Sequence, residues 1–270
     1  MNFFKVLFGG KNETSEEKKK TDEAKDFEIL KYDGVKALRT NQLSQAIQCF
    51  NHALNIREDL ECRDYLSQAL MHNNEMLAAY EQLQKLHEAQ PDNEDILLRM
   101  AQVAFMMEDY GAMVSACEKS LLINKENPTI YYLYGRACMG QEDDTNAIAM
   151  FTKAIAMHED YADAYLMRAK VELAGDNVEA AEEDCQWLME RAAEVEDVLL
   201  LKAQVETAKG QLEEAITYYG KVIETNPFSI EGYQQRAEVR VKTGDQQGAE
   251  EDRAKVLELQ ERNAEIEARG

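Results

Sequence analysis

The sequence predicts an all-α protein, a right-handed α-solenoid of seven helix hairpins. One block of 33 residues and six blocks of 34 follow one another in register between residues 27 and 263. A fixed period of this size is typical of stacked supersecondary units. Within each block, apolar residues recur at helical spacing in two stretches of about a dozen residues, separated by a break.

The alignment of the blocks is visible in two columns of small residues. The blocks span residues 27–59, 60–93, 94–127, 128–161, 162–195, 196–229 and 230–263. Their eighth residue is always small: Gly34, Ser67, Ala101, Gly135, Ala169, Ala203 and Ala237. Their twentieth is small in six of seven blocks: Ala46, Ala79, Met113, Ala147, Ala181, Ala215 and Ala249. Small residues on both helices of a block indicate that the two helices cross closely.

A third column and the breaks complete the pattern. Four residues after the second column come Phe50, Leu83, Cys117, Phe151, Cys185 and Tyr219, until Arg253 interrupts the column. Turn residues follow the first helix at Asn73-Asn74, Gly175-Asp176, Gly210-Gln211 and Gly244-Asp245. Glycine and asparagine there can take the positive φ that ends a helix. Pro91, Pro128 and Pro227 all lie next to block junctions, where a missing amide donor does little harm.

The two ends of the chain differ from the blocks. Residues 1–26 are expected to be a short apolar N-terminus followed by a charged flexible linker that is disordered or loosely helical. Residues 264–270 are expected to extend the last helix. Phe3, Phe4, Leu7 and Phe8 would share one face of a short helix. That face could dock on a membrane surface or a partner, or it could pack on the first block or fray. The apolar run is too short for a membrane span or a secretion signal.

Composition and charge narrow the classes of partner, cofactor and activity that the chain is expected to have. The net charge of -22 disfavours nucleic acid as a partner, because an acidic surface repels phosphates. Five cysteines without paired spacing indicate core thiols and a reducing, cytoplasmic location. The four histidines have no ligand spacing, so neither a metal nor another cofactor is expected. No nucleophile motif or phosphate loop is present, and we expect no enzyme activity.

At these columns the chain resembles the tetratricopeptide repeat family. The resemblance covers residues 27–263, and blocks four and six fit best, with Gly135, Ala147 and Phe151 in one and Ala203, Ala215 and Tyr219 in the other. It implies a protein-binding scaffold whose first helices line a concave face through positions 2, 5, 9, 12 and 13 of each repeat.

These positions give the candidate site for a partner protein or peptide. Its residues are Leu98, Gln102, Phe105, Tyr132, Arg136, Met139, Leu166, Lys170, Leu173, Leu200 and Gln204. Arg136 and Lys170 would be neighbouring cations that a carboxylate could bridge, with Tyr132 under the guanidinium. Two alternatives remain: the apolar stripe could be inter-helix packing, and the cations could pair with Asp163 or Asp197.

A carboxylate clamp known in some members of the family is missing. Lys31 is followed by Val35 where an asparagine would complete the clamp, and the second repeat offers Asp64 and Gln68. Any acidic peptide bound here would therefore need other residues.

Charges replace apolar residues in the first helices of the last three repeats. Arg168, Lys202 and Arg236 lie in one column, and Asp184 and Asp252 follow two of them by sixteen residues. These charges predict ion pairs between repeats. Trp187, the only tryptophan, could mark a second contact or cover a neighbouring turn.

The sequence therefore predicts a non-catalytic scaffold that binds a peptide or partner segment on its concave face. One alternative is a membrane-peripheral assembly factor tethered by the N-terminus, so membrane association stays open. Another is a self-associating subunit that binds its own N-terminal segment.

Overall fold

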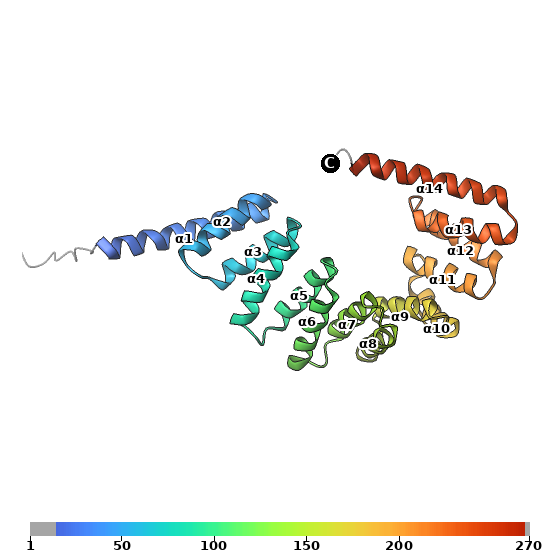
Figure 1. The fold of residues 1–270 in the computed structure, drawn as a ribbon, viewed down its shortest axis with the longest axis horizontal. Coiled ribbons are helices and arrows are strands. Elements are labelled where there is room, and N and C mark those ends of the chain that lie inside the picture. The colour runs from blue at the N-terminus through green and yellow to red at the C-terminus, as the bar shows by residue number, and fades with distance from the viewer. Residues whose placement is uncertain (1–14, 268–270) are drawn as a thin grey trace, which may run out of the picture. The chain divides into compact units, whose positions relative to one another are not determined.

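The computed structural model describes residues 15–267, which belong to two compact units, Met1–Ile123 and Asn124–Gly270. Within residues 15–267 it contains fourteen α-helices and no strand, which confirms the all-α class and the helix hairpins. The first unit contains, in chain order, α1 (Ser15–Arg39), α2 (Leu43–Ile56), α3 (Leu60–His72), α4 (Met76–Ala89), α5 (Glu94–Met106) and α6 (Tyr110–Ile123) (Figure 1).

The second unit contains four further hairpins. Its helices are α7 (Pro128–Gly140), α8 (Asp144–Met157), α9 (Ala162–Ala174), α10 (Val178–Ala192), α11 (Glu196–Ala208), α12 (Leu212–Thr225), α13 (Ile230–Thr243) and α14 (Gln246–Glu267). In each unit, helices that are consecutive in sequence pack against each other. From α3 onward, every odd-numbered helix begins at the first residue of a block defined in the sequence.

Local sequence explains where these helices begin. Before α7, the Asn127 side chain accepts a hydrogen bond from the Thr129 amide at 3.0 Å. Pro128 occupies the first helical position, where its fixed φ suits the helix and no donor is lost. The same kind of cap precedes α3, where Asp59 accepts from the Cys62 amide at 2.8 Å.

The core of each hairpin consists of the three sequence columns. All seven residues of the first small column are buried, and all seven of the second have no exposed surface. The apolar column is buried up to Tyr219, and Arg253 is exposed in the last repeat. In two repeats the eighth residue is a glycine against a phenylalanine ring, Gly34 with Phe50 and Gly135 with Phe151. The close crossing is therefore a contact between backbone and ring.

The charged segment before residue 27 is helical from Ser15, so of the two forms expected for this linker, disordered or loosely helical, residues 15–26 take the helical one. Lysine, glutamate and alanine favour helix, and Lys19 lies one turn before Glu23 with an N–O distance of 3.9 Å. Residues 1–14 and 268–270 lie outside the described residues, and so does the predicted face at Phe3–Phe8. At the other end, α14 continues to Glu267.

The predicted ion pairs form, but within repeats rather than between them. Arg168 on α9 donates two hydrogen bonds to Asp184 on α10, at 2.8 and 2.7 Å. Arg236 and Asp252 do the same on α13 and α14, at 2.9 and 2.6 Å. Two residues sixteen apart at these positions lie on the two helices of the same hairpin, because each repeat is 34 residues long and both residues fall within it.

The turn after α9 also differs from the prediction. The residue with positive φ is Asp176, at 59°, while Gly175 is at −85°. Trp187 stacks on Tyr165 of the same repeat with ring centroids 3.9 Å apart, so it covers its own hairpin.

Candidate functional site

The odd-numbered helices of the second unit form one wall. Helix α9 contacts both α7 and α11, in addition to the even-numbered helices beside it. Within this unit, Lys170 on α9 and Gln204 on α11 each bond to the first turn of the next odd-numbered helix. Side chains from successive repeats can meet along this wall.

A cleft of about 650 Å³ lies over α9, α11 and α13. This volume is within the range of ligand sites in proteins. We call it the α9–α13 cleft; it is lined by Lys170, Leu173, Ala174, Gln204, Thr207, Ala208, Tyr219, Glu231, Gln234, Gln235, Glu238, Val239 and Lys242. Except for Tyr219 on α12, these residues all come from odd-numbered helices.

Hydrogen bonds fix the orientation of two amide side chains in the cleft. The Gln204 amide nitrogen donates to Gln235 Oε1 at 3.1 Å and to Glu231 Oε1 at 3.3 Å. Gln235 Oε1 also accepts from the Tyr219 hydroxyl at 2.8 Å, and Gln235 Nε2 donates to Glu231 Oε1 at 2.8 Å. Burial raises the pKa of Tyr219 to about 12, so the hydroxyl remains a donor over the physiological range. The amides are thus held in place before any ligand arrives.

Lys170 is also engaged with the next repeat. Its Nζ lies 3.4 Å from Asp197 Oδ1 in the first turn of α11. Gln204 and Glu231 repeat this geometry one repeat later. In both pairs, position 9 of one repeat bonds to position 2 of the next. The alternative in which Lys170 pairs with Asp197 is therefore the one observed.

The predicted site residues occupy different places. Lys170, Leu173 and Gln204 come together in the α9–α13 cleft. Leu166 and Leu200 are only 8% and 5% exposed and belong to the core, because position 5 of these repeats packs against neighbouring helices. These two side chains therefore pack between helices and do not form an open apolar stripe.

The remaining predicted residues do not line this cleft. Tyr132, Arg136 and Met139 are half-buried on α7. Leu98, Gln102 and Phe105 lie on α5 in the first unit, the glutamine exposed and the other two half-buried.

Arg136 lies beside an aromatic cluster, as predicted for its guanidinium. Its Cζ is 5.7 Å from the centroid of the Tyr132 ring. That ring in turn lies 5.2 Å from Tyr161 and 5.9 Å from Phe151. Burial raises the pKa of Tyr132. A cation and aromatic rings therefore occur together on α7.

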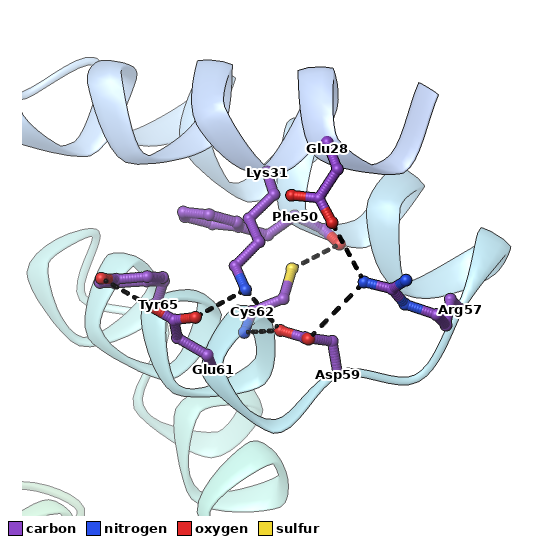
Figure 2. A network of polar contacts seen from close by, with 8 residues as sticks. All are labelled: Glu28, Lys31, Phe50, Arg57, Asp59, Glu61, Cys62 and Tyr65. Carbon is purple, nitrogen blue, oxygen red and sulfur yellow. Dashed lines mark hydrogen bonds and ion pairs between the residues drawn. The ribbon is translucent and has the colours of Figure 1, made fainter. Parts of the chain in front are cut away.

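In the first unit, Lys31 forms a link between repeats (Figure 2). Its Nζ lies 2.9 Å from Asp59 Oδ1 and 2.7 Å from Glu61 Oε2, at the start of α3. Burial disfavours the charged ammonium, but hydrogen bonds to Glu61 and Asp59 outweigh it and raise the pKa of Lys31. The Lys31 ammonium is therefore already paired with two carboxylates of this chain.

The prediction omitted the contribution of α13. Gln234, Glu238 and Lys242 line the cleft and occupy positions 5, 9 and 13 of the last repeat. These are among the positions that the family resemblance assigns to the concave face, so the sequence already indicated them. A second signal is the acid at position 2 of six repeats: Glu28, Glu61, Asp95, Asp163, Asp197 and Glu231. Three of these acids, Glu61, Asp197 and Glu231, bond to a side chain of the preceding repeat. Acids in the first turn also suit the helix dipole, so this column alone does not identify a site.

A sequence-family comparison decides what kind of repeat this is. The model of the tetratricopeptide repeat matches residues 128–161 and 196–229, the same two blocks that fit best by inspection. The chain therefore contains tetratricopeptide repeats. Such proteins bind other proteins or peptides and are in general non-catalytic scaffolds. Among curated proteins, none shows a significant match to this tetratricopeptide repeat chain.

Solved structures share the fold at low sequence identity. A tetratricopeptide repeat protein from Parabacteroides merdae aligns with a TM-score of 0.74 and 15% identity, over 87% of this chain and 93% of its own. The type IV pilus biogenesis factor PilW aligns with a TM-score of 0.66 and 18% identity, over 74% and 93%. YrrB, described as having an unusual peptide-binding site, gives 0.53 and 18%, over 66% and 92%.

In the part of the chain from 15 to 267, no helix is both long and apolar enough to cross a bilayer. The same residues contain no group of three or more histidine, cysteine, aspartate or glutamate side chains placed to hold a metal.

Proposed function

We propose that this tetratricopeptide repeat protein is a non-catalytic scaffold that holds an extended segment of a partner protein in the α9–α13 cleft. The observation that carries the proposal is the pair of oriented amides, Gln204 and Gln235, on the wall of a cleft of suitable size. The similarity to YrrB supports a peptide ligand, since that protein has a peptide-binding site on the same fold.

Amide side chains suit the backbone of an extended peptide. Their bonds within the protein leave Gln204 Oε1 as an acceptor and one hydrogen of Gln235 Nε2 as a donor for a ligand. An extended chain presents N–H and C=O groups in alternation and can bond to both. Because Gln204 is already held by Gln235 and Glu231, little side-chain entropy is lost when a ligand binds. Main-chain recognition of this kind gives affinity without fixing a single sequence.

The side chains around the cleft favour a partner segment that carries charges of both signs and some apolar residues. Lys170 and Lys242 face Glu231 and Glu238, so the lining is nearly neutral within a chain of net charge -22. Leu173 and Val239 provide apolar contacts. A partner segment with both charges and one or two apolar anchors would match these groups.

The predicted role of Lys170 remains part of the proposal. The partner of Lys170, Asp197, has a side chain that is 62% exposed, and ion pairs of this kind contribute only about 0–1 kcal/mol. A ligand carboxylate can therefore replace Asp197 at little cost. Arg136 on the neighbouring helix α7 would extend the same contact toward the start of the unit.

Selection of peptides from a random display library on the full chain tests the proposal. Enriched peptides should bind Gln204→Ala and Glu238→Lys at least about tenfold more weakly, as expected for central contacts. Lys170→Glu should weaken selectively those peptides that carry a carboxylate. The control is Glu224→Lys, which makes the same charge change at an exposed position of α12 outside the cleft. Enriched peptides that bind all variants equally would remove the cleft from the proposal.

We also propose a cytoplasmic location. Five free cysteines, four of them buried, suit a reducing compartment. Cell fractionation with an antibody to the chain tests this location, and recovery in the membrane or secreted fraction would contradict it.

A further inference from the structure

The first repeat leaves open a surface that every other repeat has covered. The third residue of repeats two to seven is buried in each case: Cys62, Ile96, Ile130, Ala164, Val198 and Gly232. The equivalent residue of the first repeat, Ile29, is 58% exposed. Among residues 15–267 no other element covers it, although its position is one at which the fold normally stacks another helix.

This open surface is a groove between α1 and α2. It is lined by Asp26, Ile29, Leu30, His52, Asn55 and Ile56. Ile56 is also exposed, and Tyr32 on the same helix as Ile29 has most of its surface in solvent. An apolar groove with one acidic residue at its edge suits an apolar segment that carries a positive charge.

We propose that the N-terminal segment Asn2–Phe8 of this chain occupies the α1–α2 groove and covers Ile29. The segment contains Phe3, Phe4, Leu7 and Phe8, and Lys5 is its only charged residue. Its apolar side chains match Ile29 and Ile56, and Lys5 matches Asp26.

The connection is long enough for this contact. Ile29 lies about 21 Å along α1 from Ser15, at a rise of about 1.5 Å per residue. Residues 8–15 can span about 23 Å when extended, at about 3.3 Å per residue. Phe4, four residues farther from Ser15 than Phe8, can therefore reach the level of Ile29 with length to spare for a reversal of direction before Ser15. A tether this short gives a local concentration in the millimolar range, so weak contacts suffice.

The proposal assigns a resting position to the segment that was otherwise a candidate membrane or partner anchor. An apolar face held in its own groove is withdrawn from bilayers and from other proteins. Any partner that takes the segment would have to displace it and would expose Ile29.

Methyl NMR on the full chain with labelled isoleucine tests this contact. Deletion of residues 2–8 should shift the methyl signals of Ile29 and Ile56 and leave that of Ile123, which has similar exposure to Ile56, unchanged. The full chain should give NOEs between phenylalanine ring protons and the Ile29 methyl group. Ile29→Asp should abolish the NOEs between phenylalanine rings and the Ile56 methyl group, whereas Leu77→Asp, at a similarly exposed position on α4, should not.

Two results would overturn the proposal. One is an Ile29 signal that does not change when residues 2–8 are deleted. The other is NOEs that appear only between labelled and unlabelled copies in a mixed sample, because the occupant would then be the segment of a second molecule. Neither result bears on the α9–α13 cleft, whose peptide selection is a separate measurement.

Discussion

The close helix crossing in the fourth repeat gives a prediction about a single methyl group. A Cβ added to Gly135 would lie 2.6 Å from Phe151 Cε1 and 2.8 Å from Cδ1. Carbon atoms in contact lie about 3.5–4.0 Å apart, so Gly135→Ala requires the ring or the helix to move by about 1 Å. The ring cannot easily move, because Phe151 has no exposed surface and packs on Tyr132.

The magnitude follows from two opposing effects. Replacing glycine by alanine within a helix stabilises by about 1 kcal/mol. Overpacking a filled core destabilises by about 1–3 kcal/mol. Gly220→Ala on α12 isolates the first effect, since the nearest atom to its added Cβ is Arg236 Nη1 at 3.9 Å. The two variants should therefore differ in unfolding free energy by about 1–3 kcal/mol, with Gly135→Ala the less stable.

Urea denaturation followed by circular dichroism measures this difference, because both glycines belong to the second unit. Adding Phe151→Leu to each variant should reduce the difference, since the ring atoms that meet the new methyl group are removed. If Gly135→Ala proves as stabilising as Gly220→Ala, the two helices do not approach as closely as described, and the reasoning on the small column fails.

Three further predictions concern the turn, the ion pairs and the thiols. Glu142 has a φ of 60°, so Glu142→Gly should raise the unfolding free energy by about 0.5–1 kcal/mol. Gly244 has a φ of 86° with open space around it, so Gly244→Ala should lower the unfolding free energy. Thermal denaturation of both variants checks that the two changes have opposite signs. Arg168→Leu leaves the buried Asp184 carboxylate unpaired and should cost about 3–5 kcal/mol, and adding Asp184→Leu should recover much of it in a double-mutant cycle. Burial raises the pKa of the Cys185 thiol from 9.0 to about 11, so the unfolded chain loses this proton first, and stability should fall between pH 9 and 11; a slope unchanged in Cys185→Ala would contradict this.

Much of the fold could be predicted because its signals repeat. One small residue is weak evidence, but seven in a single column fix the register of all hairpins. The start of α1 could not be found this way, because residues 15–26 precede the first block and carry no column. Their helix depends on propensity and on pairs such as Lys19 with Glu23.

The site could be predicted only in part, because a residue's position in the repeat identifies the helix face on which it lies but not how deeply its side chain is buried. Lys170 and Gln204 at position 9 face the cleft, whereas Leu166 and Leu200 at position 5 are buried. In the last repeat Gln234 occupies position 5 and lines the cleft.

The polar pairs between repeats connect ligand binding to the spacing of the helices. Lys170 with Asp197 and Gln204 with Glu231 each join an odd-numbered helix to the next, and Lys170, Gln204 and Glu231 also line the α9–α13 cleft. A ligand that bonds to Lys170 or Gln204 therefore competes with a contact between repeats. Because each pair contributes about 1 kcal/mol or less, the exchange costs little. The apolar core that Leu166 shares with Val198 and Leu201 across the repeat boundary takes no part in this exchange. The buried Arg168–Asp184 and Arg236–Asp252 pairs lie within hairpins and remain intact. We therefore expect a ligand to exchange the polar pairs between repeats and to leave the ion pairs within each hairpin in place.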